Sequence, residues 1–240
     1  MMTIYLTILL SSFFITFMGT PLSILIARSV KLLDIPGRDP LKIHREPIPL
    51  LGGLGITSAI YLSLFIASQH FALPHSVMLS LGISLSLIFT IGLIDDYRGL
   101  SPKMRLAGQL LAASVFIFVG QYSVNLFQNQ VMNSIITIFY VVAATNAMNL
   151  LDGIDGLATG TALVASLGFL FGFAIFNNGM GLILSSGCIG ACAGFLFYNF
   201  NPARIFLGDN GSTVLGFLLG AMAVIFSSNL TSFSYFMFPL

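Results

Sequence analysis

The chain has 240 residues, of which 57% are apolar and only 7% are charged, whereas about 25% of the residues in an ordinary soluble domain are charged. Nine basic and eight acidic side chains cannot cover the surface of a 25.8 kDa globule, and the mean hydropathy is +0.99. Soluble, disordered, disulfide-rich and nucleic-acid-binding proteins are therefore excluded, because each needs polar, cysteine-rich or basic surface. We expect an all-α polytopic membrane protein, embedded in a lipid bilayer and binding no nucleic acid.

The spacing of the charges predicts the number of membrane spans. Five intervals contain no Asp, Glu, Lys or Arg, and they are residues 1–27, 47–94, 106–151, 156–203 and 210–240. One span needs roughly 20 apolar residues, so the first and last intervals hold one helix each and the longer intervals hold two. The sequence thus predicts about eight transmembrane helices, over residues 2–27, 51–68, 76–94, 106–120, 131–147, 157–176, 181–198 and 213–230.

The same intervals predict the topology. Each two-span interval returns the chain to the face that it left, so every charged segment lies on one side of the membrane. Because all Lys and Arg residues share that side, the positive-inside rule makes it cytoplasmic. The cytoplasmic loops are then about 28–50, 95–105, 148–156 and 199–212, within a single domain over 1–240. Both termini are predicted to be extracytoplasmic, and the first apolar segment is too long for a signal peptide.

Small residues within the predicted spans indicate close helix packing. Gly190 and Gly194, and then Gly216 and Gly220, have the GxxxG spacing that lets helix backbones approach in lipid. Cysteines 188 and 192 are four residues apart, which suits one helical face but neither a disulfide nor a zinc site. We interpret all of these positions as packing residues.

The first two cytoplasmic segments carry charged candidates. In the proline-rich first loop, Lys42 and His44 are candidates for anion binding. In the second, Asp95 and Asp96 are adjacent where the third helix leaves the membrane. Neighbouring carboxylates repel one another, so near an apolar helix end they favour a cation, or one of them has a raised pKa suited to proton transfer. A solvated acidic pair that only sets topology is the simpler alternative.

The third segment, NAMNLLDGIDGLATG, has the most distinctive pattern. Asp152 and Asp155 are three residues apart and each precedes a glycine, while Asn146 and Asn149 precede them with the same spacing. Glycines let the backbone approach a ligand closely. Carboxylate and amide oxygens are hard ligands of the kind that Mg²⁺ prefers.

The fourth segment, FNPARIFLGDNGS, places Arg204, Asp209 and Asn210 in a glycine-flanked turn before the last helix. The N-terminal amides of that helix can hold an anion. Carboxylates from three loops would repel one another if they converged without a cation, so convergence implies a divalent metal. Mg²⁺ takes one or two carboxylates together with substrate phosphates, and such a site at a membrane suits phosphoryl transfer.

Four motifs together resemble a known enzyme family. They are the acidic pair at 95–96, NAMNLLDGIDGL at 146–157, FLGDNGS at 206–212, and a first loop that ends in PIPLLGG. In order and in predicted face they resemble the polyprenyl-phosphate N-acetylhexosamine-1-phosphate transferases, from about Asp34 to Gly216. The resemblance implies that undecaprenyl phosphate attacks the β-phosphate of a UDP-N-acetylhexosamine, with N-acetylglucosamine the expected sugar. UMP leaves, and a polyprenyl-diphospho-sugar begins a cell-envelope polysaccharide at the cytoplasmic face of a bacterial inner membrane.

The resemblance also implies roles for individual residues. Asp209 would be the main Mg²⁺ ligand, with Mn²⁺ as a substitute, and Asn149 would lie close to the metal or diphosphate. Asp152 and Asp155 would lie by the nucleotide, with Phe206 against the uracil ring. The candidates for catalysis beside the lipid phosphate are Asp95 and Asp96. The remaining candidates for substrate binding are Asn146, Arg204, Asn210, Lys42 and His44.

Three alternatives remain open at this point. The family pattern continues past the GDNGS turn with further helices and a histidine-rich cytoplasmic loop, whereas this sequence stops at Leu240. The chain is then expected to be an active enzyme, with a homodimer possible, or else a catalytically incomplete fragment or partner subunit. A transporter is the alternative from another class. The absence of charges within the predicted spans argues against it, because transporters carry functional charges at membrane depth.

Overall fold

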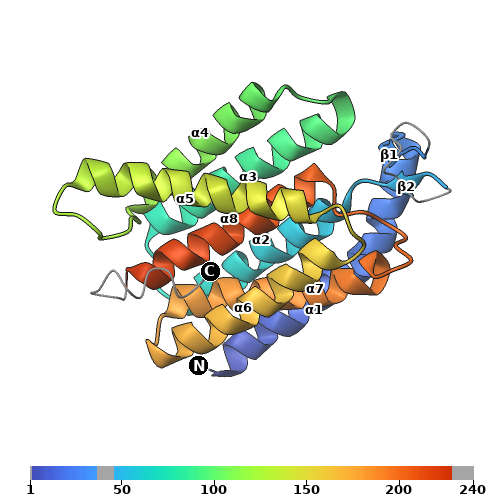
Figure 1. Cartoon of the computed structure of the whole chain (residues 1–240). Helices are drawn as coiled ribbons and strands as arrows, with labels where there is room; N and C mark the ends of the chain where they lie inside the picture. The colour runs from blue at the N-terminus through green and yellow to red at the C-terminus, as the bar shows by residue number, and fades with distance from the viewer. Residues whose placement is uncertain (1, 37–45, 229–240) are drawn as a thin grey trace.

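The computed structural model describes residues 2–36 and 46–228, which form a bundle of long helices (Figure 1). The helices are α1 Met2–Ser29, α2 Gly52–His70, α3 His75–Arg98, α4 Pro102–Gly120, α5 Gln130–Leu151, α6 Leu157–Ile175, α7 Gly179–Asn199 and α8 Asp209–Ser227. In the described part of the chain, all eight helices are long and apolar enough to cross a membrane. The prediction of an eight-span all-α membrane protein is confirmed, while the orientation of the termini stays a prediction.

Several helices extend further than the charge-free intervals predict. Helix α3 continues past the acidic pair to Arg98, and Gly99 ends it with φ of 68°. Helix α4 begins at Pro102, where the side chain of Ser101 accepts from the Met104 amide as an N-cap. Helix α8 begins at Asp209 and not at residue 213. A charge-free interval indicates the part of a helix that lies in the hydrocarbon layer, whereas capping residues determine where the helix ends. The helices therefore continue beyond these intervals, and the acidic pair at 95–96 and Asp209 lie on helix termini instead of in loops.

A short antiparallel ladder adds the only strands found among the described residues. Strand β1 (Leu33–Asp34) pairs with β2 (Ile48–Pro49), with Leu33 opposite Pro49. The carbonyl of Pro49 then accepts from the amide of Phe206, 2.9 Å away. The ladder therefore ties the first loop to the segment that precedes α8.

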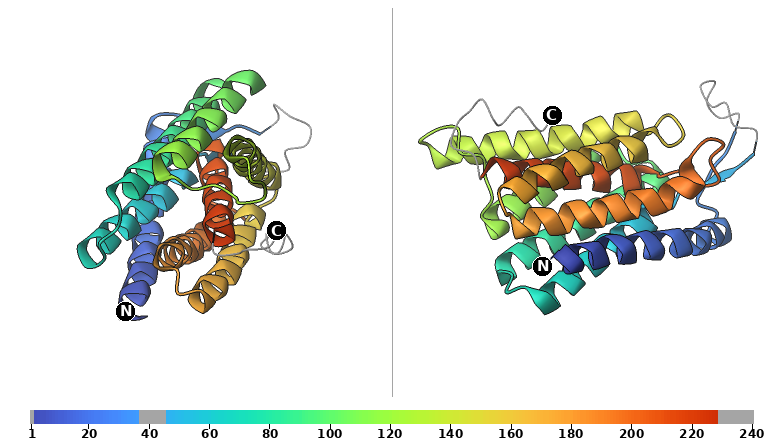
Figure 2. Two further views of the ribbon diagram at one scale, coloured as in Figure 1. Left: turned by 90° about the vertical axis from the view of Figure 1, so that its left-hand side faces the viewer. Right: turned by 90° about the horizontal axis from the view of Figure 1, so that it is seen from below.

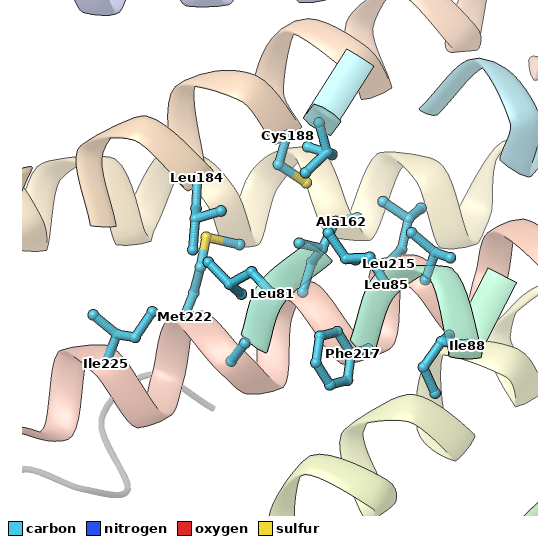
Figure 3. Packing of buried hydrophobic residues seen from close by; sticks show 14 of the residues in the cluster. Leu81, Leu85, Ile88, Ala162, Leu184, Cys188, Leu215, Phe217, Met222 and Ile225 are labelled. Carbon is cyan, nitrogen blue, oxygen red and sulfur yellow. The ribbon is translucent and has the colours of Figure 1, made fainter. Parts of the chain in front are cut away.

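Helix α8 lies at the centre of the bundle, as Figure 2 shows, and packs against α2, α3, α5 and α6. Its side chains are buried on nearly every face, as expected of a helix that is apolar all round. Leu81, Leu85 and Ile88 of α3 and Leu215, Phe217 and Met222 of α8 are among the buried side chains of this core (Figure 3). Cys188 and Cys192 of α7 are buried free thiols, consistent with a packing role.

The two GxxxG pairs lie where helices cross closely. A Cβ on Gly194 of α7 would stand 2.5 Å from the backbone oxygen of Phe13 in α1, and Gly190 is packed against α1 as well. Gly216 and Gly220 of α8 contact the backbone of α5 in the same way. Side chains at these positions would force the helices apart, so the predicted packing role is confirmed.

Candidate active site

The segments that carry the predicted site residues gather at one end of the bundle (Figure 1). They are the β1–β2 ladder and the α3–α4, α5–α6 and α7–α8 connections. The other three turns lie at the opposite end, as expected from helices of similar length that alternate in direction. This arrangement agrees with the predicted sharing of one membrane face by all charged loops.

Asn149 and Asp209 join the last turn of α5 to the first turn of α8. The side-chain amide of Asn149 donates to Asp209 Oδ1 at 2.5 Å and to Ser212 Oγ at 3.0 Å. The Ser212 hydroxyl is fully buried and donates in turn to the carbonyl of Gly208 at 2.9 Å. Asn149 therefore presents its nitrogen to Asp209, and this contact fixes the orientation of the carboxylate.

Arg105, in the first turn of α4, links two of the carboxylates. Its Nε lies 3.1 Å from Asp95 Oδ2, and its Nη1 lies 3.5 Å from Asp209 Oδ2. The side chains of Asp95 and Asp209 are 6% and 28% exposed, and that of Arg105 is 37% exposed. The planar guanidinium suits such bridging and also suits phosphate oxygens. Arg105 was not among the predicted site residues, although it lies at the membrane boundary of a predicted span.

Asp95 is buried, and one of its two carboxylate oxygens accepts a hydrogen bond. Oδ1 accepts from the amide of Leu100 at 2.6 Å, which closes the turn after α3. Oδ2 faces the Nε of Arg105. The side chain thus holds the α3–α4 turn and the guanidinium in place. Its predicted role in catalysis stays a prediction.

Asp96 accepts three hydrogen bonds from the start of α8. The amide of Asp209 donates to Oδ1 at 2.9 Å, and the amide and side-chain Nδ2 of Asn210 donate to Oδ2 at 2.9 and 2.6 Å. Asn210 Nδ2 also lies 2.9 Å from the carbonyl of Leu50. Asn210 itself is 0% exposed, and its predicted role in substrate binding stays a prediction. Asn210 supports the site structurally, because its side-chain Nδ2 donates to Asp96 and to the carbonyl of Leu50.

Asp152 follows α5 and is half-buried. Burial raises the pKa of this carboxyl well above its ordinary value, and the negative charges of Asp96 and Asp209 raise it further. The backbone amide of Gly208 acts in the opposite direction. The three carboxylates are therefore close enough to repel one another, although they come from different parts of the chain.

This acidic set is suited to a magnesium ion that binds together with phosphates. Among the residues described, no three Asp, Glu, His or Cys side chains are placed to hold a metal ion alone. Mg²⁺ does not require that, because it commonly takes one or two carboxylates, substrate phosphates and water. The side chain of Asp209 is 28% exposed. A cation would relieve the repulsion between Asp152 and the neighbouring carboxylates. The donor set therefore fits Mg²⁺ at Asp209, with Asp152 beside it.

Asn146 lies one turn before Asn149 and pairs with a residue of α4. Its Nδ2 donates to Gln109 Oε1 at 2.6 Å and to the carbonyl of Val142 at 2.8 Å. Gln109 is buried, and Asn146 is exposed on its other side. This pair of side-chain amides connects α4 and α5 about one helical turn further into the bundle than Arg105 and Asn149. Sequence reasoning missed Gln109, because nothing in the sequence shows that it faces Asn146.

Asp155 contacts the loop between α7 and α8. Its Oδ2 accepts from Asn201 Nδ2 and from the amide of Ala203, both at 3.0 Å. This loop leads to Arg204, which is exposed, and to Phe206, which is half-buried. Asp155 therefore connects two predicted nucleotide-binding segments. The other two candidates, Lys42 and His44, lie outside the described residues.

An apolar groove runs along α6 from this end of the bundle. It has a volume of about 1040 Å³ and extends from Ile154 and Asp155, past Gly168, to Ile175 and to Phe226 of α8. These residues are about one bilayer core apart, since a helix rises 1.5 Å per residue. Several of its lining residues are exposed on the bundle, among them Val164, Phe171 and Ile175, and the groove begins at the loop that carries Asp152.

Comparison with known proteins identifies the family. Residues 78–227 match the model of Glycosyl transferase family 4. The chain is 34% identical over 216 residues to a decaprenyl-phosphate N-acetylglucosaminephosphotransferase of Mycolicibacterium smegmatis, a match that covers 80% of this chain and 53% of that protein. It is 31% identical over 248 residues to a phospho-N-acetylmuramoyl-pentapeptide-transferase of Bacillus anthracis, a match that covers 91% of this chain and 74% of that protein. The chain thus spans about half the length of the mycobacterial relatives, and it belongs to glycosyl transferase family 4.

Proposed function

We propose that this protein transfers N-acetylglucosamine 1-phosphate from a UDP-sugar to a polyprenyl phosphate in the membrane. The relative from M. smegmatis is named for decaprenyl phosphate and N-acetylglucosamine, and the match covers most of this chain. The observation that carries the proposal is the convergence of Asp209, Asn149 and Arg105 from three helices at one end of the bundle. The acceptor that we propose is undecaprenyl phosphate, as the resemblance to the bacterial family implies.

The proposed reaction replaces one phosphoanhydride bond by another. An oxygen of the polyprenyl phosphate forms a bond to the β-phosphorus of the UDP-sugar, the bond from that phosphorus to the bridging oxygen breaks, and UMP leaves. A phosphate monoester has a second pKa near 6 and is largely a dianion at neutral pH. The nucleophile therefore needs positioning more than it needs a base. This agrees with the structural contacts of the acidic pair, in which Asp95 holds Leu100 and Arg105 and Asp96 holds the start of α8.

The proposed roles of the site residues follow from their charge and hydrogen bonds. Asp209 and Asp152 would hold Mg²⁺, which when bound neutralises the diphosphate and the leaving group. Asn149 orients Asp209 by its hydrogen bond. Arg105 lies between Asp95 and Asp209 and presents its remaining donors to phosphate oxygens, where it stabilises charge that develops on the departing UMP. These are the roles that the geometry supports best.

The nucleotide and the lipid would approach from different directions. Asp155, Arg204 and Phe206 border the loop assigned to the nucleotide, with Phe206 as the candidate to stack on uracil. The apolar groove along α6, which opens beside Asp155, supports an acceptor that is carried by a lipid. The reaction would be the first membrane step of cell-envelope polysaccharide synthesis, at the cytoplasmic face of the inner membrane.

The direct test is release of UMP by the purified chain in detergent. We expect UMP from UDP-N-acetylglucosamine only when both undecaprenyl phosphate and Mg²⁺ are present, with loss of the signal in EDTA and in the Asp209→Asn variant. UDP-N-acetylmuramoyl-pentapeptide in place of UDP-N-acetylglucosamine tests the sugar. Binding of UDP-sugar without UMP release would overturn the proposal in favour of an incomplete fragment or a partner subunit.

A further inference from the structure

We propose that Asp96 is a positioning residue, whose carboxylate caps the N-terminus of α8 from a different helix and so fixes the backbone of Asp209. The inference deepens the proposed function, because it separates the two residues of the acidic pair by role. It rests on that function only where turnover is measured. The hydrogen bonds on which the inference rests lie within the protein and involve neither metal nor substrate.

The start of α8 lacks a cap of its own. The first amides of a helix have no partner within the helix and need an acceptor from elsewhere. Gly208 occupies the N-cap position with φ of 72° and has no side chain to supply one. The carboxylate of Asp96 accepts from the first two amides of α8, those of Asp209 and Asn210, both at 2.9 Å. A negative charge at this place is also favoured by the helix dipole.

Glycines on both sides allow this close approach. Gly92 lies one turn before Asp96 on α3, and a Cβ there would stand 2.5 Å from the carbonyl oxygen of Asp209. A Cβ on Gly208 would stand 2.8 Å from Asn210 Nδ2 and 2.9 Å from Asp96 Oδ2. The first turn of α8 therefore lies directly against α3, and no side chain separates the carboxylate from the amides that it caps.

The cap determines where the side chain of Asp209 points. With its amide held by Asp96 and its Oδ1 held by Asn149, the Asp209 carboxylate is fixed at both ends. Its Oδ2 then faces Arg105. Asp96, by contrast, directs one oxygen at the amide of Asp209 and the other at two donors of Asn210, so both of its oxygens accept from the start of α8. A base in the transfer reaction needs an accessible lone pair directed at the substrate.

Hydrogen exchange of the full chain in detergent tests the cap without metal, substrate or turnover. In Asp96→Ala and Asp96→Asn, we expect the amides of residues 209 and 210 to exchange roughly tenfold faster than in the parent, which is the scale on which loss of a helix N-cap acts. Tyr97→Phe, an exposed neighbour, is the matched control and should leave them unchanged. Unchanged exchange in the folded Asp96 variants would overturn the proposal.

A second measurement distinguishes positioning from base catalysis. We expect Asp96→Asn to raise the Mg²⁺ or Mn²⁺ concentration for half-saturation at least tenfold, while the limbs of the pH–rate profile stay where they are in the parent. Gly92→Ala should reproduce both results, because it displaces the same turn and leaves every carboxylate intact. Loss of the acidic limb in Asp96→Asn, with unchanged metal affinity and unchanged exchange, would show a base instead. If the parent itself releases no UMP, the exchange result still decides the inference.

Discussion

The side-chain amide of Asn149 donates to the carboxylate of Asp209 at 2.5 Å, across 60 residues of sequence. This hydrogen bond joins α5 to the central helix α8 at the end of the bundle where the acidic residues gather. Because Asn149 also donates to Ser212, its amide is itself held in place and helps to orient the carboxylate to which we assign the metal.

Replacing Asn149 by Leu should therefore impair the site without adding charge. We expect transfer activity to fall about 10- to 100-fold, the range typical when a partner that orients a metal ligand is removed. The concentration of Mg²⁺ for half-saturation should rise. The measurement is UMP release over a Mg²⁺ titration. Ser212→Ala removes the second acceptor of Asn149 and the hydrogen bond to the Gly208 carbonyl, but it leaves the contact between Asn149 and Asp209. It should therefore cost less than tenfold, and equal losses in the two variants would contradict this account of Asn149.

Arg105 offers a prediction about charge. In Arg105→Gln, Asp95 and Asp209 lose the cation between them, and phosphate oxygens lose a donor. We expect kcat to fall about 10²- to 10³-fold, as on removal of one donor that stabilises transition-state charge, with Arg105→Lys intermediate. Single-turnover UMP release measures it. Lys103→Gln changes an exposed cation two residues away and should retain activity within about twofold. A comparable loss in that control would show that net charge alone matters.

The raised pKa of Asp152 predicts how the metal-free protein responds to pH. An acid whose pKa is higher in the folded than in the unfolded state destabilises the fold once it is ionised. Stability should then be greatest near the ordinary carboxyl pKa of about 4 and should fall as the pH rises through the raised value. In Asp152→Asn this fall should be smaller and the Tm at pH 7.5 higher than in the parent.

Thermal unfolding in EDTA, from pH 5 to 8, measures this effect. Addition of Mg²⁺ should raise the Tm of the parent more than that of Asp152→Asn, because the cation relieves a repulsion that the variant lacks. A pH dependence that is identical in the two proteins would contradict the assigned repulsion.

Asp155 gives a prediction about the donor substrate. Asp155→Ala removes the acceptor for Asn201 and Ala203, so the loop that leads to Phe206 should loosen. We expect the KM for UDP-N-acetylglucosamine to rise about tenfold, with a smaller change in kcat. Steady-state kinetics at saturating acceptor separates the two parameters. A change confined to kcat would indicate that Asp155 acts at the reacting phosphates.

The bundle was largely predictable, because membrane spans are recorded in the sequence as long intervals without charge. The helix ends were not. Ser101 and Gly99 set the boundary between α3 and α4, and their effect is local and independent of hydropathy. Likewise, α8 begins at Asp209 because its first amides find acceptors from another helix.

The candidate site was predictable by residue type but only partly by contact. Acidic and amide residues beside glycines indicated the region to which we assign the metal. The burial of Asn210 depends on Gly92 of α3 and Gly53 of α2, which let it pack between two other helices, and no local pattern reports that. Arg105 follows two other basic residues, Arg98 and Lys103, and residue type alone does not distinguish it from them. Its position in the first turn of a membrane helix, four residues before a buried Gln109, was the available signal that it faces the bundle.

The central claim is that carboxylates of α8 and the α5–α6 loop hold one divalent cation, and binding of Mn²⁺ followed by electron paramagnetic resonance tests it most directly. In the detergent-purified chain with UDP present to supply phosphates, we predict one Mn²⁺ per chain that Mg²⁺ displaces. This binding should be lost in Asp209→Asn and retained in Tyr97→Phe. Equal Mn²⁺ binding by the parent and Asp209→Asn, or none by the parent, would contradict the account.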